Sequence, residues 1–566
     1  MRYWLLLTWV GALFWLHPAL SQPRPTDFIR ELWYKNGVIY NLDVKVFNDS
    51  NGDGIGDFNG LTAKLDYLKD LGVTVIWLAP FQPSPGEDDG YDVSDFLGID
   101  KRLGTTRDFQ NFMQQAKRRG FRVMMDLVVN HTSNQHPWFQ QARKSKSSPF
   151  RSWYVWSEKR PRDADKGMVF PGVQKETWSY DSLAGEYFFH RFYRFQPDLN
   201  AQNAAVQAEV RKAIRHWLAL GLDGFRLDAV PFFIEVPGTN IEKPEHQFDL
   251  MYWLRQYAQW RKGDVGLLGE INVEPGENKQ YFGENGQGLH MLFNFYVNQF
   301  LFYSLASGEV KTLLEALEKT KELPATAQWA HFLRNHDEID LARLSNRQRE
   351  AVFARMGPDK NMQLYDRGIR RRLAPMLSNP QQLRMVYSLL FSLPGTPVLR
   401  YGEEIGMGDD LRLKERFSIR TPMQWSSARN GGFSTAAKTL RPAISGNEYG
   451  YQRVNVAAQR KDSASLLNHI RHLIRLRGQY PEISRGEWRL LESDSPHVLA
   501  LAYEGTGRTL VTLLNFSDKP QTARFKLAGK TIRTVFAEGS ARQKGSADLS
   551  GLEMPAYGYR WIQVQP

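Results

Sequence analysis

The chain has 566 residues, of which 42% are hydrophobic and 24% are charged, so it is long and apolar enough to fold into several globular units. It contains no cysteine, which excludes disulfides, thiolate zinc sites, iron–sulfur clusters, cysteine nucleophiles and amino-terminal lipoprotein attachment. The formal net charge is +12, but the basic residues are spread along the chain and interleaved with acidic ones, which argues against nucleic acid as a partner.

The first 21 residues have the pattern of a secretory signal peptide. Arg2 precedes an apolar run from Trp4 to Leu16, and small residues follow as far as Ser21. A membrane anchor is the alternative, but this run is shorter than the roughly 20 residues that span a bilayer. We therefore expect cleavage after Ser21, export to the periplasm or the medium, and no stable membrane anchor on the mature chain.

Short apolar segments rich in β-branched residues alternate with amphipathic stretches along most of the chain. In chain order, the predicted strands are 38–47, 73–80, 122–129, 224–230, 265–271, 290–295, 331–337 and 396–404. The clearest predicted helices are 61–72, 106–120 and 204–221, each of which ends in glycine. This alternation predicts an α/β fold, namely a (β/α)8 TIM barrel.

Two segments depart from the alternation and predict additional domains. Residues 131–197 carry many aromatic side chains without a helical period, which indicates a subdomain inserted after the third strand. Near the C-terminus, apolar runs at 498–505, 510–516 and 559–564 are separated by turn residues, as in an antiparallel β domain. The predicted organisation is a signal peptide (1–21), a barrel (22–130 and 198–482), the insertion (131–197) and a C-terminal β-sandwich domain (483–566).

Acidic side chains stand at the ends of predicted strands, and a barrel brings such positions to one open face. Arg226 and Asp228 lie on the same side of a strand, so we expect the guanidinium to keep Asp228 ionised, as a nucleophile requires. Glu270 follows an almost wholly apolar run, where burial should raise its pKa and suit it to act as a general acid.

The seventh predicted strand ends in Asn335, His336 and Asp337, which offer hydrogen bonds and a further carboxylate to sugar hydroxyls. For any one of the acids taken alone, a structural salt bridge or a helix cap is the simpler interpretation. Taken together, one ionised and one protonated carboxylate are what glycoside cleavage through an oxocarbenium-like transition state requires.

Four segments, DLVVNHTS, GFRLDAV, LLGE and RNHDE, resemble the sequence regions of the α-amylase family, glycoside hydrolase family 13, in order and in spacing. The resemblance implies a retaining enzyme in which Asp228 is the nucleophile, Glu270 the acid/base and Asp337 the transition-state stabiliser. It also implies a group of substrate contacts, namely Asp88, Tyr91, His131, Arg226, His336 and Arg420. Asp88 is chosen over Asp89 on spacing alone.

The turn at 48–58, NDSNGDGIGDF, has the composition of a cation-binding loop. Its oxygen donors stand at alternate positions, namely Asp49, Asn51, Asp53, the Ile55 carbonyl and Asp57. Gly60 stands where an EF-hand carries its bidentate glutamate, so the loop is not an EF-hand. Calcium in a structural role is what the family resemblance implies, and a polar turn without a metal is the alternative.

A narrower resemblance covers nearly the whole mature chain, including WYKNGVIY, QWAHFLRNHDE and LPGTPVLRYGEEIGMGD, and points to the trehalose synthases, the maltose glucosyltransferases of this family. It implies a second calcium site and no organic cofactor. The residues of that site would be Asn130, Asp198, the carbonyls of Phe232 and Phe233, and Glu235. The stretch LRLKERFSIRTPMQW departs from the pattern of the trehalose synthases at Lys414, Glu415 and Phe417.

The expected function is interconversion of maltose and trehalose by intramolecular glucosyl transfer, with some hydrolysis, on a small α-glucoside substrate. A secreted hydrolytic α-glucosidase or α-amylase is one alternative, since the same carboxylates serve when water replaces glucose as the acceptor. A catalytically silent barrel that acts as an interaction module is an alternative of another class, because a fold does not guarantee activity. The oligomeric state is not predicted.

Overall fold

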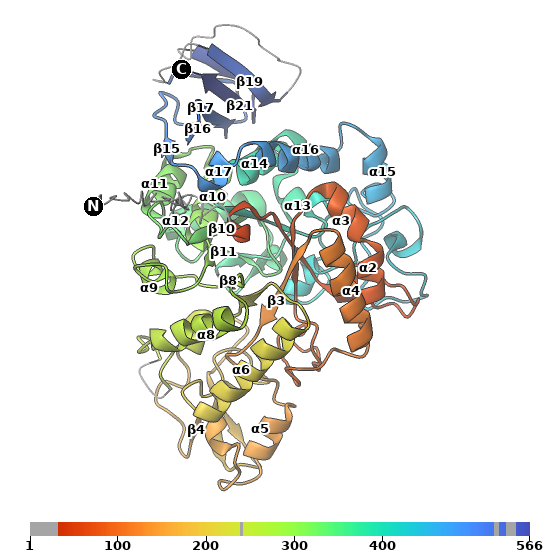
Figure 1. Cartoon of the computed structure of the whole chain (residues 1–566), viewed down its shortest axis with the longest axis vertical. Helices are drawn as coiled ribbons and strands as arrows, with labels where there is room; N and C mark the ends of the chain where they lie inside the picture. The colour runs from red at the N-terminus through yellow and green to blue at the C-terminus, as the bar shows by residue number, and fades with distance from the viewer. Residues whose placement is uncertain (1–31, 238–240, 526–530, 539–550, 566) are drawn as a thin grey trace, which may run out of the picture.

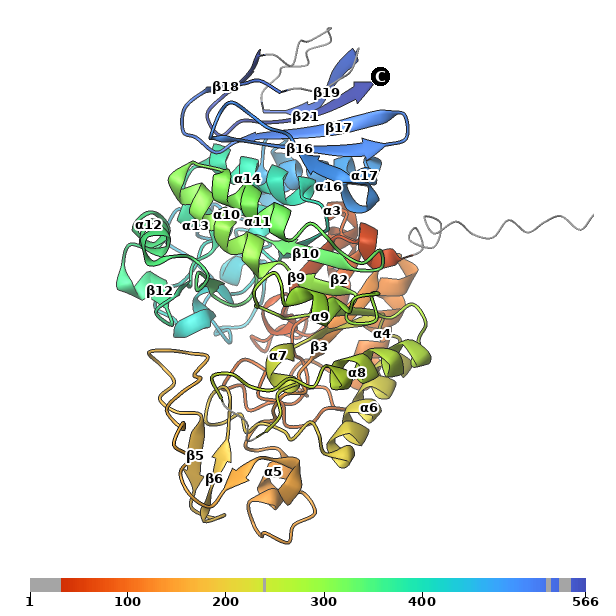
Figure 2. The same ribbon diagram turned by 90° about the vertical axis from the view of Figure 1, so that its left-hand side faces the viewer.

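The computed structural model describes residues 32–237, 241–525, 531–538 and 551–565, and the predicted signal peptide lies outside them. Figures 1 and 2 show an elongated molecule with a barrel in the middle, the inserted region at one end and a C-terminal β sheet at the other. Within the described segments, no helix has both the length and the apolar composition needed to cross a bilayer.

The centre of the fold is a closed barrel of parallel strands in the order β1-β14-β10-β9-β8-β7-β3-β2. The strands are β1 (Ile39–Leu42), β2 (Val75–Leu78), β3 (Arg122–Leu127), β7 (Gly224–Leu227), β8 (Gly266–Gly269), β9 (Met291–Phe293), β10 (Gln328–Phe332) and β14 (Thr396–Arg400). Each strand pairs with the next in the chain, and Val398 of β14 lies opposite Ile39 of β1 to close the ring. The predicted (β/α)8 barrel is confirmed.

Strand β1 shows why the barrel strands read as continuous apolar runs. Ile39 packs inside the barrel beside Val75 and Trp77, whereas Tyr40 and Leu42 belong to the core between the strands and the surrounding helices. Successive side chains therefore alternate between two buried layers, as expected for a parallel sheet covered on both faces.

Helices pack around the barrel, and their ends follow local signals. α4 (Thr106–Arg118) begins with a capping box between Thr105 and Asp108 and ends just before Gly120, whose φ is +81°. The predicted helix at 61–72 is divided at Lys64 into α2 (Phe58–Ala63) and α3 (Leu65–Leu71). The other helices of this layer are α6 (Ala204–Ala219), α7 (Val230–Phe233), α8 (Phe248–Arg261), α9 (Asn278–Phe282), α10 (Phe295–Ser307), α11 (Lys311–Lys319), α12 (Asn346–Met356), α13 (Leu373–Leu377), α14 (Pro380–Ser392), α15 (Val456–Lys461), α16 (Leu466–Gln479) and α17 (Glu482–Arg485).

All eight predicted barrel strands extend past their observed C-terminal ends, and the first and the seventh do so most, by five residues each. The first stops at Leu42, because Asp43 caps a 3-10 helix, η2 (Val44–Val46), by accepting a hydrogen bond from the Lys45 amide. The seventh stops at Phe332, so the RNHD segment lies on the loop that follows β10. This correction places Asp337 beyond the strand, at the open face of the barrel.

The inserted region forms a small sheet of β4 (Trp156–Ser157), β6 (Glu186–Phe189) and β5 (Trp178–Asp181) beside α5 (Pro137–Ala142). The C-terminal region has a five-stranded antiparallel sheet in the order β15-β16-β17-β21-β19 and the pair β18-β20. Their bounds are β15 (Trp488–Leu490), β16 (Val498–Gly505), β17 (Arg508–Asn515), β18 (Gln521–Ala523), β19 (Thr531–Ala537), β20 (Leu552–Met554) and β21 (Tyr559–Gln565). A further small sheet on the barrel loops joins β11 (Ile339–Asp340), β13 (Gly368–Ile369) and β12 (Gln363–Leu364).

Candidate active site

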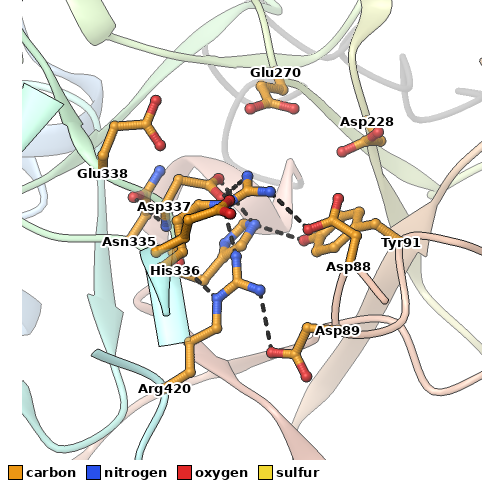
Figure 3. Close-up of polar contacts among 12 residues, drawn as sticks. Asp88, Asp89, Tyr91, Asp228, Glu270, Asn335, His336, Asp337, Glu338 and Arg420 are labelled. Carbon is orange, nitrogen blue, oxygen red and sulfur yellow. Dashed lines mark hydrogen bonds and ion pairs between the residues drawn. The ribbon is translucent and has the colours of Figure 1, made fainter. Parts of the chain in front are cut away.

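Three carboxylates meet at the open face because each follows a barrel strand. Asp228 comes directly after β7, Glu270 directly after the neighbouring strand β8, and Asp337 on the loop after β10. All three line one cavity of about 740 Å³. Figure 3 shows Asp228 and Glu270 on one side of this space and Asp337 on the other. The open C-terminal face of a parallel barrel is the usual place for a catalytic site.

Arg226 connects the carboxylates on the barrel side. Its Nη2 lies 2.7 Å from Glu270 Oε2, and its Nη1 lies 2.7 Å from Asp126 Oδ1 and also contacts Asp228. The sequence spacing predicts a contact with only one of these carboxylates, Asp228. One cation therefore serves three carboxylates, two of them buried and the third, Glu270, partly exposed, so it compensates none of them fully.

The pKa values of the two central carboxyls follow from this sharing. Burial raises the pKa of Asp228 to about 6, although Arg226 acts to lower it. Burial raises the pKa of Glu270 further, to about 7, against the same guanidinium. The expectation of a proton-carrying Glu270 is in keeping with this value. Arg226 lowers the pKa of Asp228, as expected, but burial has the larger effect on it.

Asp337 is held as an anion on the opposite side of the cavity. Burial acts to raise its pKa, but His336, Arg416 and Arg420 together bring the pKa well below its usual range. Arg416 Nη1 lies 2.8 Å and Arg420 Nη2 3.2 Å from Asp337 Oδ1. A permanently charged carboxylate at this place can stabilise positive charge that develops on a bound sugar ring.

His336 and Tyr91 form a stacked pair at the base of the cavity. Their rings are 5.3 Å apart and inclined by 6°, and the Tyr91 hydroxyl lies 2.6 Å from His336 Nε2. Burial lowers the pKa of His336 to about 3, so its imidazole is neutral at physiological pH. His131 also lines the cavity, where Gln196 Nε2 lies 3.2 Å from its Nε2.

Asp88 and Asp89 have separate environments. Asp88 lines the cavity and pairs with Arg416 Nη2 at 2.7 Å. Asp89 lies behind the cavity, where its carboxylate pairs with Arg420 at 3.1 Å and with Lys45 at 3.0 Å. Only Asp88 of this pair can reach a substrate in the cavity.

Two residues expected to contact the substrate are almost fully buried beside the cavity. Arg226 and Arg420 have side chains that are 1% and 2% exposed, and neither lines the cavity. Arg420 donates hydrogen bonds to Asp89, to Asp337 and to the His336 carbonyl. Both arginines orient carboxylates, and their contact with a bound sugar stays a prediction.

Sequence reasoning missed Arg416 and Glu338, which both line the cavity. Arg416 bridges Asp88 and Asp337, and its position four residues before Arg420, in a stretch already singled out, was the available signal. Glu338 directly follows Asp337, and its Oε2 has no hydrogen-bond partner in the structure. Burial raises the pKa of Glu338 to about 7.

The predicted calcium loop at 48–58 is held by its own carboxylates. Asp49 accepts hydrogen bonds from the amides of Gly52 and Gly54, and Asp57 accepts from the Ser50 amide and caps α2. The donor atoms are the hard oxygens that calcium prefers, so the set fits the ion in kind. No cluster of three or more acidic or histidine side chains arranged to hold a metal occurs in the described part of the chain.

The residues of the second predicted calcium site come together beside a cavity of about 430 Å³, which Asp198, Phe232, Phe233 and Glu235 line. Asn130 Nδ2 lies 3.1 Å from Asp198 Oδ2. The Arg191 guanidinium already pairs with Glu235, so a cation here would have to displace it. The residues offer oxygen donors but do not form an open ligand set.

Two carboxylates on adjacent strands, with a third facing them across a barrel cavity, define a glycoside-active enzyme of the TIM-barrel class. The α-amylase catalytic domain family matches residues 44–486, and the sucrose hydrolase-like C-terminal domain family matches residues 507–563. The chain belongs to the α-amylase family, glycoside hydrolase family 13.

The chain is similar to trehalose synthases and to oligo-1,6-glucosidases. The trehalose synthase/amylase TreS of Mycolicibacterium smegmatis is 43% identical over 565 residues, which cover 96% of this chain and 94% of that protein. The corresponding Mycobacterium tuberculosis protein is 39% identical, with 94% and 90% covered. An oligo-1,6-glucosidase of Parageobacillus thermoglucosidasius is 32% identical, with 88% and 92% covered.

Solved structures of related enzymes share the architecture. The trehalulose synthase MutB of Pseudomonas mesoacidophila superposes with a TM-score of 0.76 at 26% identity, covering 94% of this chain and 99% of that one. The trehalose-6-phosphate hydrolase of Bacillus licheniformis has a TM-score of 0.78 at 25% identity, covering 94% and 100%. The fold therefore accommodates both isomerases and hydrolases.

Proposed function

We propose that the chain is a retaining glucosyl-transferring enzyme that interconverts maltose and trehalose, with hydrolysis as a side reaction. Asp228 attacks the anomeric carbon while Glu270 gives its proton to the departing glycosidic oxygen, which leaves as a hydroxyl of glucose. The product of this step is a glucosyl ester on Asp228. A different hydroxyl of the retained glucose then attacks the same carbon, Glu270 takes its proton, and the Asp228 carboxylate is released.

The observation that carries this proposal is the pair of carboxylates on the Arg226 guanidinium. Asp228 and Glu270 reach it from adjacent strands, and their pKa values of about 6 and about 7 allow one to be ionised while the other holds a proton. The Glu270 side chain is 26% exposed and that of Asp228 9%, so Glu270 is the more accessible proton donor. The identities of 39–43% to trehalose synthases support the choice of substrate.

A hydrolytic α-glucosidase is the second candidate. It is favoured by the similarity to oligo-1,6-glucosidases, at 30–32% identity, and by the altered stretch around Phe417. Both functions share every bond-breaking step and differ only in whether glucose or water attacks the ester.

Product analysis decides among these functions. The purified protein is incubated in parallel with maltose, trehalose and sucrose, and the sugars are separated by chromatography. Trehalose formed from maltose, and maltose from trehalose, support the transferase. Glucose without trehalose supports the hydrolase. A properly folded protein that forms no product from any of the three would leave an interaction module as the better explanation.

We propose two further properties that the sequence suggested. The loop at 48–58 binds a structural calcium ion, supported by its oxygen donors and by the family resemblance. The chain is exported and its signal peptide is removed after Ser21, supported by the apolar run at 4–16. Amino-terminal sequencing of the protein from cell fractions tests export, and a chain that keeps residues 1–21 would contradict it.

A further inference from the structure

Three side chains from separate segments meet beside the active-site cavity, and none of them has yet been given a role. Tyr193 comes from the inserted region, Tyr365 from the turn between β12 and β13, and Glu415 from the start of the 3-10 helix η6 (Glu415–Ile419). The Tyr365 hydroxyl donates to Glu415 Oε2 at 2.9 Å, and the Tyr193 hydroxyl donates to the same oxygen. The two hydroxyls are 2.9 Å apart. We call these three residues the Tyr–Glu–Tyr clamp.

The clamp is built around a charged acceptor. Burial acts to raise the pKa of Glu415, but the hydrogen bonds from Tyr193, Lys414 and Tyr365 lower it below the usual range. Hydrogen bonds to an ionised carboxylate are stronger than those between neutral groups. Lys414 Nζ, which is largely exposed, lies 3.1 Å from the other carboxylate oxygen.

An aromatic ring joins the clamp to Arg416. Phe170 stacks on Tyr193 with ring centres 4.7 Å apart at 28°, and on Tyr365 at 4.7 Å and 32°. The Arg416 guanidinium lies 5.0 Å from the centre of the Phe170 ring, on which it can make a cation–π contact. The two tyrosine rings of the clamp therefore pack against the Phe170 ring, and Arg416 contacts that ring.

Arg416 also directly follows Glu415 in the chain, and its two terminal nitrogens hold Asp88 and Asp337 at 2.7 and 2.8 Å. A guanidinium shared by two cavity carboxylates can be effective only if its own position is fixed. The Phe170 ring, which packs against both tyrosines of the clamp, contacts this guanidinium and helps to fix it.

The backbone at the clamp is held in a conformation that ordinary residues avoid. Tyr365, Asp366 and Glu415 have φ values of +55°, +56° and +43°. Non-glycine residues in this region persist only where surrounding contacts hold them. Loss of the clamp would therefore allow both loops to relax away from the inserted region.

We propose that Tyr193, Tyr365 and Glu415 are positioning residues that join the inserted region to the barrel loops, hold Arg416 against Asp88 and Asp337, and thereby keep glucose in the cavity while the glucosyl ester waits. This inference rests on the proposed function. With the clamp intact, the retained glucose attacks the ester and gives a disaccharide. With the clamp open, glucose escapes, water attacks, and the product is free glucose.

The test removes the hydroxyls and keeps the rings. Tyr193→Phe, Tyr365→Phe and the double variant abolish the hydrogen bonds to Glu415 but preserve the stacking on Phe170. We expect the ratio of glucose to trehalose formed from maltose to rise about threefold in each single variant and further in the double variant, while total maltose cleavage falls much less than the about 10²-fold expected when Arg416 itself is removed. Tyr180→Phe is the matched control, because Tyr180 lies in the same inserted region, is 48% exposed, and should leave the ratio unchanged.

A second variant and a second measurement keep the inference testable. Glu415→Gln retains the size of the acceptor but loses its charge, so it should also raise the ratio of glucose to trehalose. It replaces the double variant in the test if the double variant does not fold. If wild-type protein forms no trehalose, the proposed transfer is wrong, but the clamp can still be tested. Glucose is bound to the Glu270→Gln protein, and its dissociation is followed by stopped-flow tryptophan fluorescence with and without the clamp. Faster release when the clamp is removed supports the clamp. Native-like variants with an unchanged product ratio, or with unchanged glucose release in that second case, would overturn it.

Discussion

Asp228 and Glu270 contact the two terminal nitrogens of a single guanidinium, that of Arg226. Because β7 and β8 are adjacent parallel strands, the residues that follow them leave the barrel side by side. The Ala229 amide, immediately after Asp228, also donates to Glu270 Oε2 at 3.1 Å. The two carboxyls are therefore joined through a side chain and through the backbone, and they should titrate as a pair.

Removing either carboxylate should abolish most of the activity without unfolding the protein. Asp228→Asn removes the nucleophile and should lower kcat on maltose by about 10³-fold or more, and Glu270→Gln removes the proton donor and should lower it by about 10²–10⁴-fold. Initial rates and thermal unfolding of each purified variant provide the measurement. A variant that keeps more than about a tenth of wild-type kcat would contradict its assigned role.

The leaving group distinguishes the two roles. A 4-nitrophenyl glucoside needs little help from an acid, because nitrophenolate is a stable anion. Formation of the ester by Glu270→Gln should therefore be much less impaired on this substrate than on maltose, whereas Asp228→Asn should be impaired on both. Equal impairment of the two variants on both substrates would show that the roles are assigned wrongly.

Activity should have a narrow pH optimum. The reactive form has Asp228 ionised and Glu270 protonated, and burial raises their pKa values to about 6 and about 7. As pH rises through about 6, Asp228 loses its proton and kcat/KM increases; above about 7, Glu270 loses its proton and kcat/KM declines. The two apparent pKa values belong to the coupled pair. Initial rates between about pH 4.5 and about pH 9 test this, and a rate that stays level above pH 8 would exclude Glu270 as the general acid.

The barrel could be predicted from the sequence because its strands are buried on both faces and therefore read as apolar runs. The acids after β7 and β8 could be predicted for the same reason, since they interrupt those runs. Arg416 could not, because its partners Asp88 and Asp337 lie 328 and 79 positions away in the chain. The sharing of Arg226 was missed for a similar reason: the spacing of two residues links it to Asp228, but only the pairing of β7 with β8 brings Glu270 to it.

Arg416 should matter to catalysis as much as a residue that touches the reacting atoms. Arg416→Met leaves Asp88 without its ion pair and Asp337 with only Arg420 and His336, so both carboxylates are held less firmly. We expect kcat/KM on maltose to fall by about 10²-fold. Steady-state kinetics of the purified variant, with thermal unfolding as a check on folding, provide the measurement.

Arg412→Met is the matched control for this prediction. Arg412 stands in the same stretch and also pairs with an aspartate, Asp410, but its side chain is 83% exposed. An exposed pair of this kind contributes little. The control should therefore behave as the wild type. A comparable loss of activity in both variants would show that the stretch tolerates no substitution and that the bridge made by Arg416 has no special role.

Calcium should stabilise the protein through the loop at 48–58. A ligand that binds only the folded state at about 100 times its Kd adds about 2.7 kcal/mol of stability, which for a chain of this size corresponds to a rise in Tm of a few degrees at most. Thermal unfolding in millimolar calcium and in EDTA measures the shift. Asp53→Asn keeps the shape of an exposed loop residue while removing one charge, and it should reduce the shift.

Asp66→Asn provides the control, because it removes an equally negative side chain, 81% exposed, from α3, outside the loop. It should lose stability to the same small extent with and without calcium and keep the full calcium-dependent shift. Equilibrium dialysis measures the number of calcium ions bound per chain. If the second site also binds an ion, which would have to displace Arg191 from Glu235, the wild type should bind about two ions and Glu235→Gln about one. A wild-type Tm that is the same in calcium and in EDTA would instead identify the loop as a polar turn, held by the hydrogen bonds that Asp49 and Asp57 already accept.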